Sequence, residues 1–177
     1  MARVRNDVSV VESGVKLKTW ATPSPTGPFS VVARDGVVVA AGFTDNVDAL
    51  LERVPDVDGA ESVSEIAGVT EHIAAYLDGD LSAVDEIVID PVGSPRKKAA
   101  WDVMRAVPPG PISYRELAER MEPPASARSA ARACATNPIA LIVPCHRFIG
   151  SDGKLHGFYW GLDVKEWLLG HEQRFTR

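Results

Sequence analysis

Cys145 and His146 stand side by side in the sequence and are the residue types best suited to nucleophilic chemistry. Cysteine reacts as the thiolate, so a nucleophilic cysteine needs a base or a positive environment. His146 could take the thiol proton through a bridging water, because adjacent side chains often point apart. Glu172 could orient the imidazole and complete a Cys–His–Glu relay. A buried, inert cysteine is the alternative that these residue types leave open.

The other cysteine and the other histidines form no comparable group. The chain has only one other cysteine, Cys134, and the spacing of Cys134 and Cys145 fits no structural zinc pattern. His156 and His171 also fall at no spacing typical of zinc ligands, so we expect no metal site. The sequence predicts a cytoplasmic protein with two free thiols, because its start lacks the apolar core of a secretion signal. It has no run of about 18 apolar residues, so we expect no membrane span.

Charge is divided unevenly along the 177 residues. Residues 1–90 hold 6 Lys and Arg against 16 Asp and Glu, whereas residues 91–177 hold 13 against 8. This asymmetry favours binding of a polyanion by the second half, although the net charge is −5. We expect two small domains with these bounds, 1–90 and 91–177.

The first half is predicted to be a small α+β unit with a mainly antiparallel sheet. Segments 16–21 and 29–43 are rich in Val, Ala and aromatic residues, and Asp35-Gly36 is a strong hairpin turn signal. No motif in this half indicates chemistry. Helices are expected at 46–53 and 69–77, and a strand at 84–90.

The second half contains the elements that must position Cys145. Ser94-Pro95 begins one helix, and the capping box Ser113–Glu116 begins the next. Two short helices followed by a hairpin are the parts of a winged helix-turn-helix. The remaining elements are an alanine-rich helix at 126–136, an apolar segment at 139–143 that leads to Pro144–Arg147, a hairpin that pairs 148–149 with 154–155, and a last helix at 163–173.

The alanine-rich helix and the aromatic run 158–160 have less certain roles. Small residues make the helix thin, so it could approach a DNA groove closely with Arg128 near its start, or simply pack tightly against other helices. Three successive aromatic residues cannot all face one core, so some should line a pocket or stack on a base.

A long ordered set of residues resembles one known family. The set comprises Trp101, Pro109-Gly110, Ser113-Tyr114, Ala118, Arg128, Asn137-Pro138, Pro144 to Arg147, Gly153, Leu155, Gly157, Gly161, Lys165, Leu168-Leu169 and Glu172. Over about Pro95 to Glu172 the chain resembles the O6-alkylguanine-DNA alkyltransferases. Cys134 between two alanines, and Trp160 before Gly161, are most similar to the C-terminal domain of the bacterial adaptive-response protein.

The resemblance implies direct-reversal DNA repair. We expect a monomer, because the sequence shows no apolar stripe that would lie exposed. The damaged guanine is flipped out of duplex DNA bound through its minor groove, and Cys145 takes the alkyl group irreversibly, with a single turnover and no cofactor. The implied fold is an N-terminal ribonuclease-H-like domain followed by a C-terminal winged-helix domain. By resemblance, Arg128 replaces the flipped base in the stack, Tyr114 contacts the 3′ phosphate and assists the leaving oxygen, and Asn137 braces the turn before the cysteine. The implied DNA-contacting residues are Arg128, Tyr114, Ala127, Ser129 and Arg132, and the implied pocket residues are Cys134, Phe148, Phe158, Tyr159 and Trp160.

Several positions depart from the family pattern. Phe158 stands where tyrosine is usual, and Phe148 replaces a smaller aliphatic residue. Bulky Tyr159 and Trp160 favour methyl over larger alkyl groups.

Three other functions remain open from the sequence. Non-enzymatic lesion-binding proteins resemble this chain but lack the cysteine. A winged-helix regulator would read a specific sequence in the major groove. A cysteine hydrolase is the least favoured.

Overall fold

The first half of the chain is built on a four-stranded sheet, seen in the computed structural model, which describes residues 16–57 and 59–176. Strands β1 (Leu17–Ser24), β2 (Gly27–Arg34) and β3 (Val37–Gly42) form an antiparallel meander, and β4 (Ala60–Ser62) adds parallel to β1. The order is β3-β2-β1-β4. Asp35 and Gly36 both have positive φ, 50° and 82°, as the tight two-residue hairpin turn requires. The predicted hairpins are therefore confirmed.

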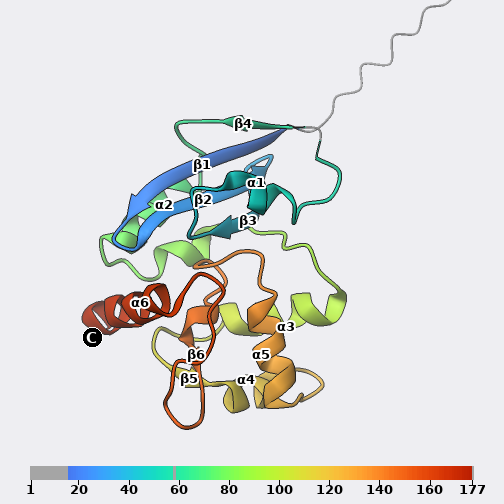
Figure 1. Ribbon diagram of the computed structural model, residues 1–177, viewed down its shortest axis with the longest axis vertical. Coiled ribbons are helices and arrows are strands. Elements are labelled where there is room, and N and C mark those ends of the chain that lie inside the picture. Colours follow the sequence, from blue (N-terminus) through green and yellow to red (C-terminus); the bar gives the residue numbers. More distant parts are fainter. Residues whose placement is uncertain (1–15, 58, 177) are drawn as a thin grey trace, which may run out of the picture.

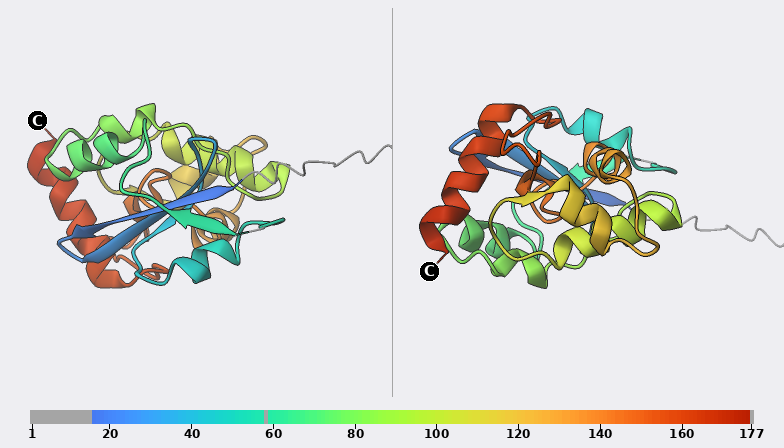
Figure 2. Two further views of the ribbon diagram at one scale, coloured as in Figure 1. Left: turned by 90° about the horizontal axis from the view of Figure 1, so that it is seen from above. Right: turned by 90° about the horizontal axis from the view of Figure 1, so that it is seen from below.

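Two helices lie on opposite sides of this sheet (Figure 2, left). Helix α1 (Val47–Leu51) begins at Asn46, whose side chain accepts from the Ala49 amide, and its Leu50 packs on one face beside Val32 and Ala40. Helix α2 (Thr70–Leu77) packs Ile73 and Tyr76 into the larger core on the other face. Both helices lie where the sequence predicts them.

The strand predicted at 84–90 is wrong. Residues Ala83–Glu86 form a short 3-10 helix, η1, and the chain then reaches the sheet only through an isolated parallel bridge between Ile89 and Val38. Val84 and Ile87 are both buried, and their spacing of three residues suits one side of a helical turn rather than one face of a strand.

The second half lies beneath the β3 edge of the sheet (Figure 1). The capping box at Ser113 is present: its hydroxyl accepts from the Glu116 amide, and the Glu116 carboxylate accepts from the Ser113 amide. The elements are α3 (Pro95–Arg105), β5 (Ile112–Ser113), α4 (Tyr114–Arg120), α5 (Ala127–Ala135), η2 (Cys145–Arg147), β6 (Phe148–Ile149) and α6 (Leu162–Phe175).

The predicted hairpin after the cysteine is present only as a turn. The Gly150 amide donates to the Lys154 carbonyl at 2.8 Å, but β6 pairs in parallel with β5 instead of with 154–155. The Leu155 carbonyl accepts from the buried Lys165 ammonium at 2.6 Å, and positive φ at His156 (54°) turns the chain away. Residues 154–155, the expected second strand of the hairpin, therefore pair with no strand.

The two halves share one core. Ala41 of β3 exchanges backbone hydrogen bonds with the segment after α5: its amide donates to Pro138 at 3.0 Å and its carbonyl accepts from Ala140 at 2.9 Å. The second half thereby covers the β3 edge, and the largest hydrophobic cluster joins Val31 and Tyr76 to Trp101. Within the described part of the chain, no helix is long and apolar enough to cross a membrane.

Candidate active site around Cys145

Asn137 fixes the backbone that presents Cys145. It follows the end of α5, and its buried side chain spans the apolar segment: Nδ2 donates to the Val143 carbonyl at 2.8 Å, and Oδ1 accepts from the Ile139 amide at 3.0 Å. Buried amides satisfied in this way make the local backbone rigid.

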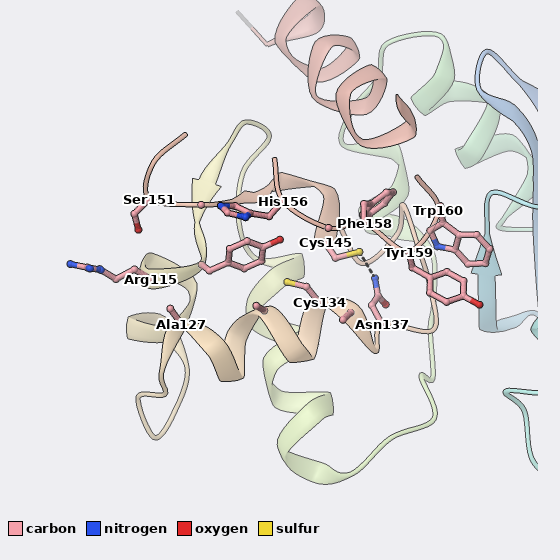
Figure 3. Close-up of a pocket in the computed structure, with 15 residues that line it drawn as sticks. Arg115, Ala127, Cys134, Asn137, Cys145, Ser151, His156, Phe158, Tyr159 and Trp160 are labelled. Atoms are coloured by element: carbon pink, nitrogen blue, oxygen red, sulfur yellow. Dashed lines mark hydrogen bonds between the residues drawn. The ribbon is translucent and has the colours of Figure 1, made fainter. Parts of the chain in front are cut away.

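The Cys145 thiol lies at the wall of a cavity, with 5% of the residue exposed. Asn137 Nδ2 also donates to its sulfur at 3.1 Å (Figure 3). Burial raises the pKa of the thiol, and the Asn137 hydrogen bond and the Lys165 charge offset that effect only in part. The resting cysteine is therefore a neutral thiol, and a base must remove its proton before it can attack.

His146 is fully buried behind the cysteine. Its Nε2 lies 2.8 Å from Glu172 Oε1, while its Nδ1 has no hydrogen-bond partner among the described residues. Burial lowers the pKa of His146 although Glu172 favours the charged ring, so the imidazole is neutral. Because the carboxylate can only accept, Nε2 carries the hydrogen and Nδ1 keeps its lone pair. The ring is thus a base whose free nitrogen can receive a proton.

Glu172 lies under a dense set of donors. Besides His146, it accepts from Arg147 through Nε (3.0 and 3.1 Å) and Nη2 (2.9 Å), from the Gly110 amide (3.2 Å) and from the Tyr76 hydroxyl (3.0 Å). Burial raises the pKa of Glu172, but the hydrogen bonds from His146 and Arg147 outweigh it and hold the pKa far below its usual range. Glu172 therefore stays ionised.

No motif or spacing in the sequence indicates a role for Arg147 or Tyr76. A role for Arg147 could have been predicted, because it belongs to the Pro144–Arg147 stretch that carries the resemblance. Tyr76 gave no signal, because it lies 96 residues before Glu172 in a helix without a motif.

The cavity beside Cys145 has a volume of about 530 Å³, within the usual range for small-molecule sites. Figure 3 shows Cys134 and Cys145 facing the same space, with Phe158, Tyr159 and Trp160 toward one end and Arg115 and Ser151 toward the other. The lining is Tyr114, Arg115, Ala127, Ala131, Cys134, Ala135, Asn137, Cys145, Gly150, Ser151, His156, Gly157, Phe158, Tyr159 and Trp160.

Four of the five predicted pocket residues line this cavity, and Phe148 does not. The Phe148 side chain is fully buried in the core and is not part of this cavity's lining. Its carbonyl accepts from Lys165 Nζ at 2.6 Å. Lys165 also lies 3.3 Å from the Tyr114 hydroxyl oxygen, a contact that the sequence did not indicate.

Tyr114 is half-buried where α4 begins, on the cavity wall. Burial first, and then the nearby thiols, raise the pKa of Tyr114 to about 12, so the hydroxyl keeps its proton near neutral pH. The Lys165 ammonium can only donate, so the Tyr114 oxygen accepts from it and the phenolic hydrogen is free to point elsewhere.

The residues predicted to contact DNA lie on α5 or beside it. Ala127 lines the cavity, and Arg128 and Arg132 are exposed. The Ser129 hydroxyl lies 3.1 Å from that of Ser126, which caps the helix. A smaller cavity of about 210 Å³ is lined by Ser94, Arg96, Lys97, Ala100, Met121, Ser129, Arg132 and Ala133.

Residues of the first half reach the mouth of the main cavity. The Trp160 ring lies so close to Gly42 of β3 that a Cβ built there would stand 2.1 Å from it. The Arg53 guanidinium lies 4.4 Å from the centre of the Tyr159 ring and 5.5 Å from that of Trp160. No group of three or more His, Cys, Asp or Glu in residues 16–57 and 59–176 could hold a metal ion.

Comparison with known proteins identifies the family. The family model described as "6-O-methylguanine DNA methyltransferase, DNA binding domain" matches residues 95–174. A methylated-DNA–protein-cysteine methyltransferase from Salmonella typhimurium is 35% identical over 156 residues, which cover 84% of this chain and 91% of that protein. The chain belongs to the methylated-DNA–protein-cysteine methyltransferases.

Solved structures agree with this assignment. The crystal structure of the Mycobacterium tuberculosis O6-methylguanine methyltransferase is 26% identical with a TM-score of 0.75, over 91% of this chain and 95% of that one. Mycobacterium tuberculosis OGT in complex with DNA is 28% identical with a TM-score of 0.73, over 90% and 94%. The methyltransferase resemblance and the α+β class expected from the sequence are thus confirmed. The family model covers α3 to α6, whereas Tyr76, Gly42 and Arg53 precede it.

Proposed function

We propose that this protein repairs DNA by direct reversal, taking the alkyl group of O6-alkylguanine, mainly O6-methylguanine, onto Cys145. The observation that carries the proposal is the Cys145 thiol on the wall of an apolar cavity, followed in the chain by His146, which forms a buried pair with Glu172. Family membership supports the same reaction. The resulting thioether is not readily reversed, so each molecule acts once and needs no cofactor.

The proton and the alkyl group move in opposite directions. The Cys145 proton passes through a bridging water to His146 Nδ1, and Glu172 stabilises the imidazolium that forms. The thiolate then attacks the alkyl carbon in line with its bond to O6, the S–C bond forms and the C–O6 bond breaks. The departing base keeps the C–O6 electron pair and takes a proton from the Tyr114 hydroxyl, which restores unmodified guanine; the proton that His146 gains offsets the one that Tyr114 gives.

Double-stranded DNA is the partner that the site requires, bound through its minor groove. Helix α5 and Tyr114 present the contacts, Arg128 enters the stack, and the guanine rotates into the cavity. The exposure of Arg128 and the position of Ala127 on the cavity wall support this arrangement. Ser129 and Arg132 lie along the same helix and would face the phosphate backbone.

The finer points of the architecture belong to the same proposal. An antiparallel meander with one further strand parallel to β1 supports a ribonuclease-H-like first domain, 1–90. The packed pair α4 and α5, followed by the turn at 150–153, supports a winged-helix second domain, 91–177. We further propose that the protein acts in the cytoplasm and as a monomer.

Mass measurement tests the reaction directly. Incubation with duplex DNA carrying one O6-methylguanine should add one methyl group per protein molecule, on the peptide that contains Cys145. Cys145→Ser should gain nothing, while Cys134→Ser, the matched change of the other cavity thiol, should still be methylated. No mass gain by the wild-type protein would contradict the proposal, and tight lesion binding without it would instead support a lesion-binding protein. Turnover of an ester substrate would support a cysteine hydrolase, and lesion-independent binding at one sequence would support a regulator.

A further inference from the structure

Tyr76 connects the first half of the chain to the buried Glu172 carboxylate. It lies on α2, is fully buried, and its hydroxyl donates to Glu172 Oε1 at 3.0 Å. The same oxygen accepts from His146 at 2.8 Å. Three side chains therefore share this carboxylate oxygen: His146, the proposed base of the reaction; Arg147, through Nε and Nη2; and Tyr76, which the mechanism above does not use.

Helix α6 holds Tyr76 through two adjacent residues. His171 Nε2 lies 2.8 Å from the Tyr76 carbonyl, and the His171 and Tyr76 rings lie 5.3 Å apart, while Glu172 accepts from the hydroxyl. The position of the hydroxyl is thus fixed from both its backbone and its ring. Burial and the Glu172 charge raise the pKa of Tyr76 well above its ordinary value, so the phenol stays a donor over the whole working range of pH.

We propose that Tyr76 is a positioning residue of the first half that tunes the basicity of His146 by competing for Glu172 Oε1. This inference rests on the proposed function, in which His146 accepts the thiol proton. A donor on Oε1 draws electron density from the oxygen that faces His146 Nε2. The carboxylate then stabilises the imidazolium less, and the ring stays neutral to lower pH.

The other charged groups around His146 define what the hydroxyl can change. Arg147, from the same 3-10 helix, and Lys165, from α6, both lower the pKa of His146, and Glu172 raises it. None of these is altered when only the Tyr76 hydroxyl is removed. Tyr76→Phe keeps the ring in the core and deletes one donor, so it isolates the effect on Oε1.

The pH dependence of alkyl transfer tests the proposal. Transfer requires neutral His146, so the rate falls as pH drops through its pKa. Tyr76→Phe should raise that pKa and move the midpoint of the acid limb upward by about half a pH unit to one unit. Well above the midpoint, its rate should stay within about threefold of the wild type. Ile73→Val, a buried change one turn earlier on α2, should lower the melting temperature and leave the midpoint unchanged.

A second measurement is independent of the reaction. NMR titration of the free protein follows the His146 ring, identified among the four histidines by its loss in His146→Asn. Tyr76→Phe should shift this titration upward by the same amount as the rate profile. A His146 pKa that is unchanged or lowered in Tyr76→Phe would overturn the proposal. This holds even if the variant transfers more slowly at every pH, because slowing without a raised His146 pKa indicates a structural effect only. If the wild type transfers no alkyl group, the proposed function fails while this titration still decides the effect of Tyr76.

Discussion

The two halves of the chain differ in how clearly their sequence motifs indicate their functional roles. The second half carries the reactive cysteine, its base and the helix expected on DNA, and the sequence marks all of them. The first half carries no motif, yet in the structure it reaches the site at three points: Tyr76 under Glu172, Gly42 against Trp160, and Arg53 over Tyr159. The contrast shows that motifs mark the residues that react, whereas residues that hold them in place can lie far away in unmarked sequence.

The largest effect is expected from the second half, on removing the charge of Glu172. Glu172→Gln leaves the buried Arg147 guanidinium without its counterion, which should cost about 3–5 kcal/mol of unfolding free energy. The imidazolium also loses its stabilisation, so alkyl transfer should slow by about 100-fold or more. Urea unfolding and single-turnover kinetics measure the two effects. Glu166→Gln, an exposed change on the same helix, should alter stability by no more than about 0.5 kcal/mol.

The same carboxylate predicts how stability responds to acid. The pKa of Glu172 is lower in the folded protein than its ordinary value of 4.5, so the unfolded chain binds the proton more readily. Its contribution is complete above about pH 4.5 and is lost as pH falls toward the folded-state value. Denaturant midpoints from pH 6 to pH 3 should decline less steeply in Glu172→Gln than in the wild type. Equal slopes in the two proteins would show that this ion pair does not govern acid unfolding.

Local signals in the sequence predicted most elements, and long-range pairings explain what was missed. The Asp35-Gly36 turn and the Ser113–Glu116 capping box depend on neighbouring residues, so both could be read directly. The strand expected at 154–155 failed because Lys165, on the next helix, takes the Leu155 carbonyl. Family resemblance predicts Cys145 and its relay with His146 and Glu172, but neither pattern nor resemblance indicated Tyr76 or the burial of the Phe148 side chain.

A smaller effect is expected in the first half, at the contact between β3 and the cavity wall. Gly42→Ala keeps an ordinary backbone conformation but forces its new methyl group into the Trp160 ring. The shifts that relieve this overlap should lower the free energy of unfolding by about 1–3 kcal/mol and change the tryptophan fluorescence. Trp160→Phe removes the outer ring atoms that the methyl group meets, so the double variant should recover most of the loss. Additive losses in the two single variants would show that the contact does not couple the halves.

The smallest effect is expected at Arg53, whose substitution tests whether the first half influences which alkyl groups fit the cavity. Arg53 lies over the ring of Tyr159, which is 64% exposed, lines the cavity and meets the Trp160 ring edge-on at 4.7 Å, so the cation adds to the contacts that restrain this aromatic wall. Arg53→Met keeps an unbranched, flexible side chain and removes about 0.5–1 kcal/mol of cation–π attraction. Transfer of a methyl group should stay within about twofold, while the rate for a benzyl group relative to methyl should rise by about two- to fivefold. Arg53→Lys keeps the charge, so its benzyl-to-methyl rate ratio should lie between those of the wild type and Arg53→Met. If both rates change in proportion, Arg53 acts on the fold as a whole, and the first half contributes support at this point without influencing which alkyl groups fit.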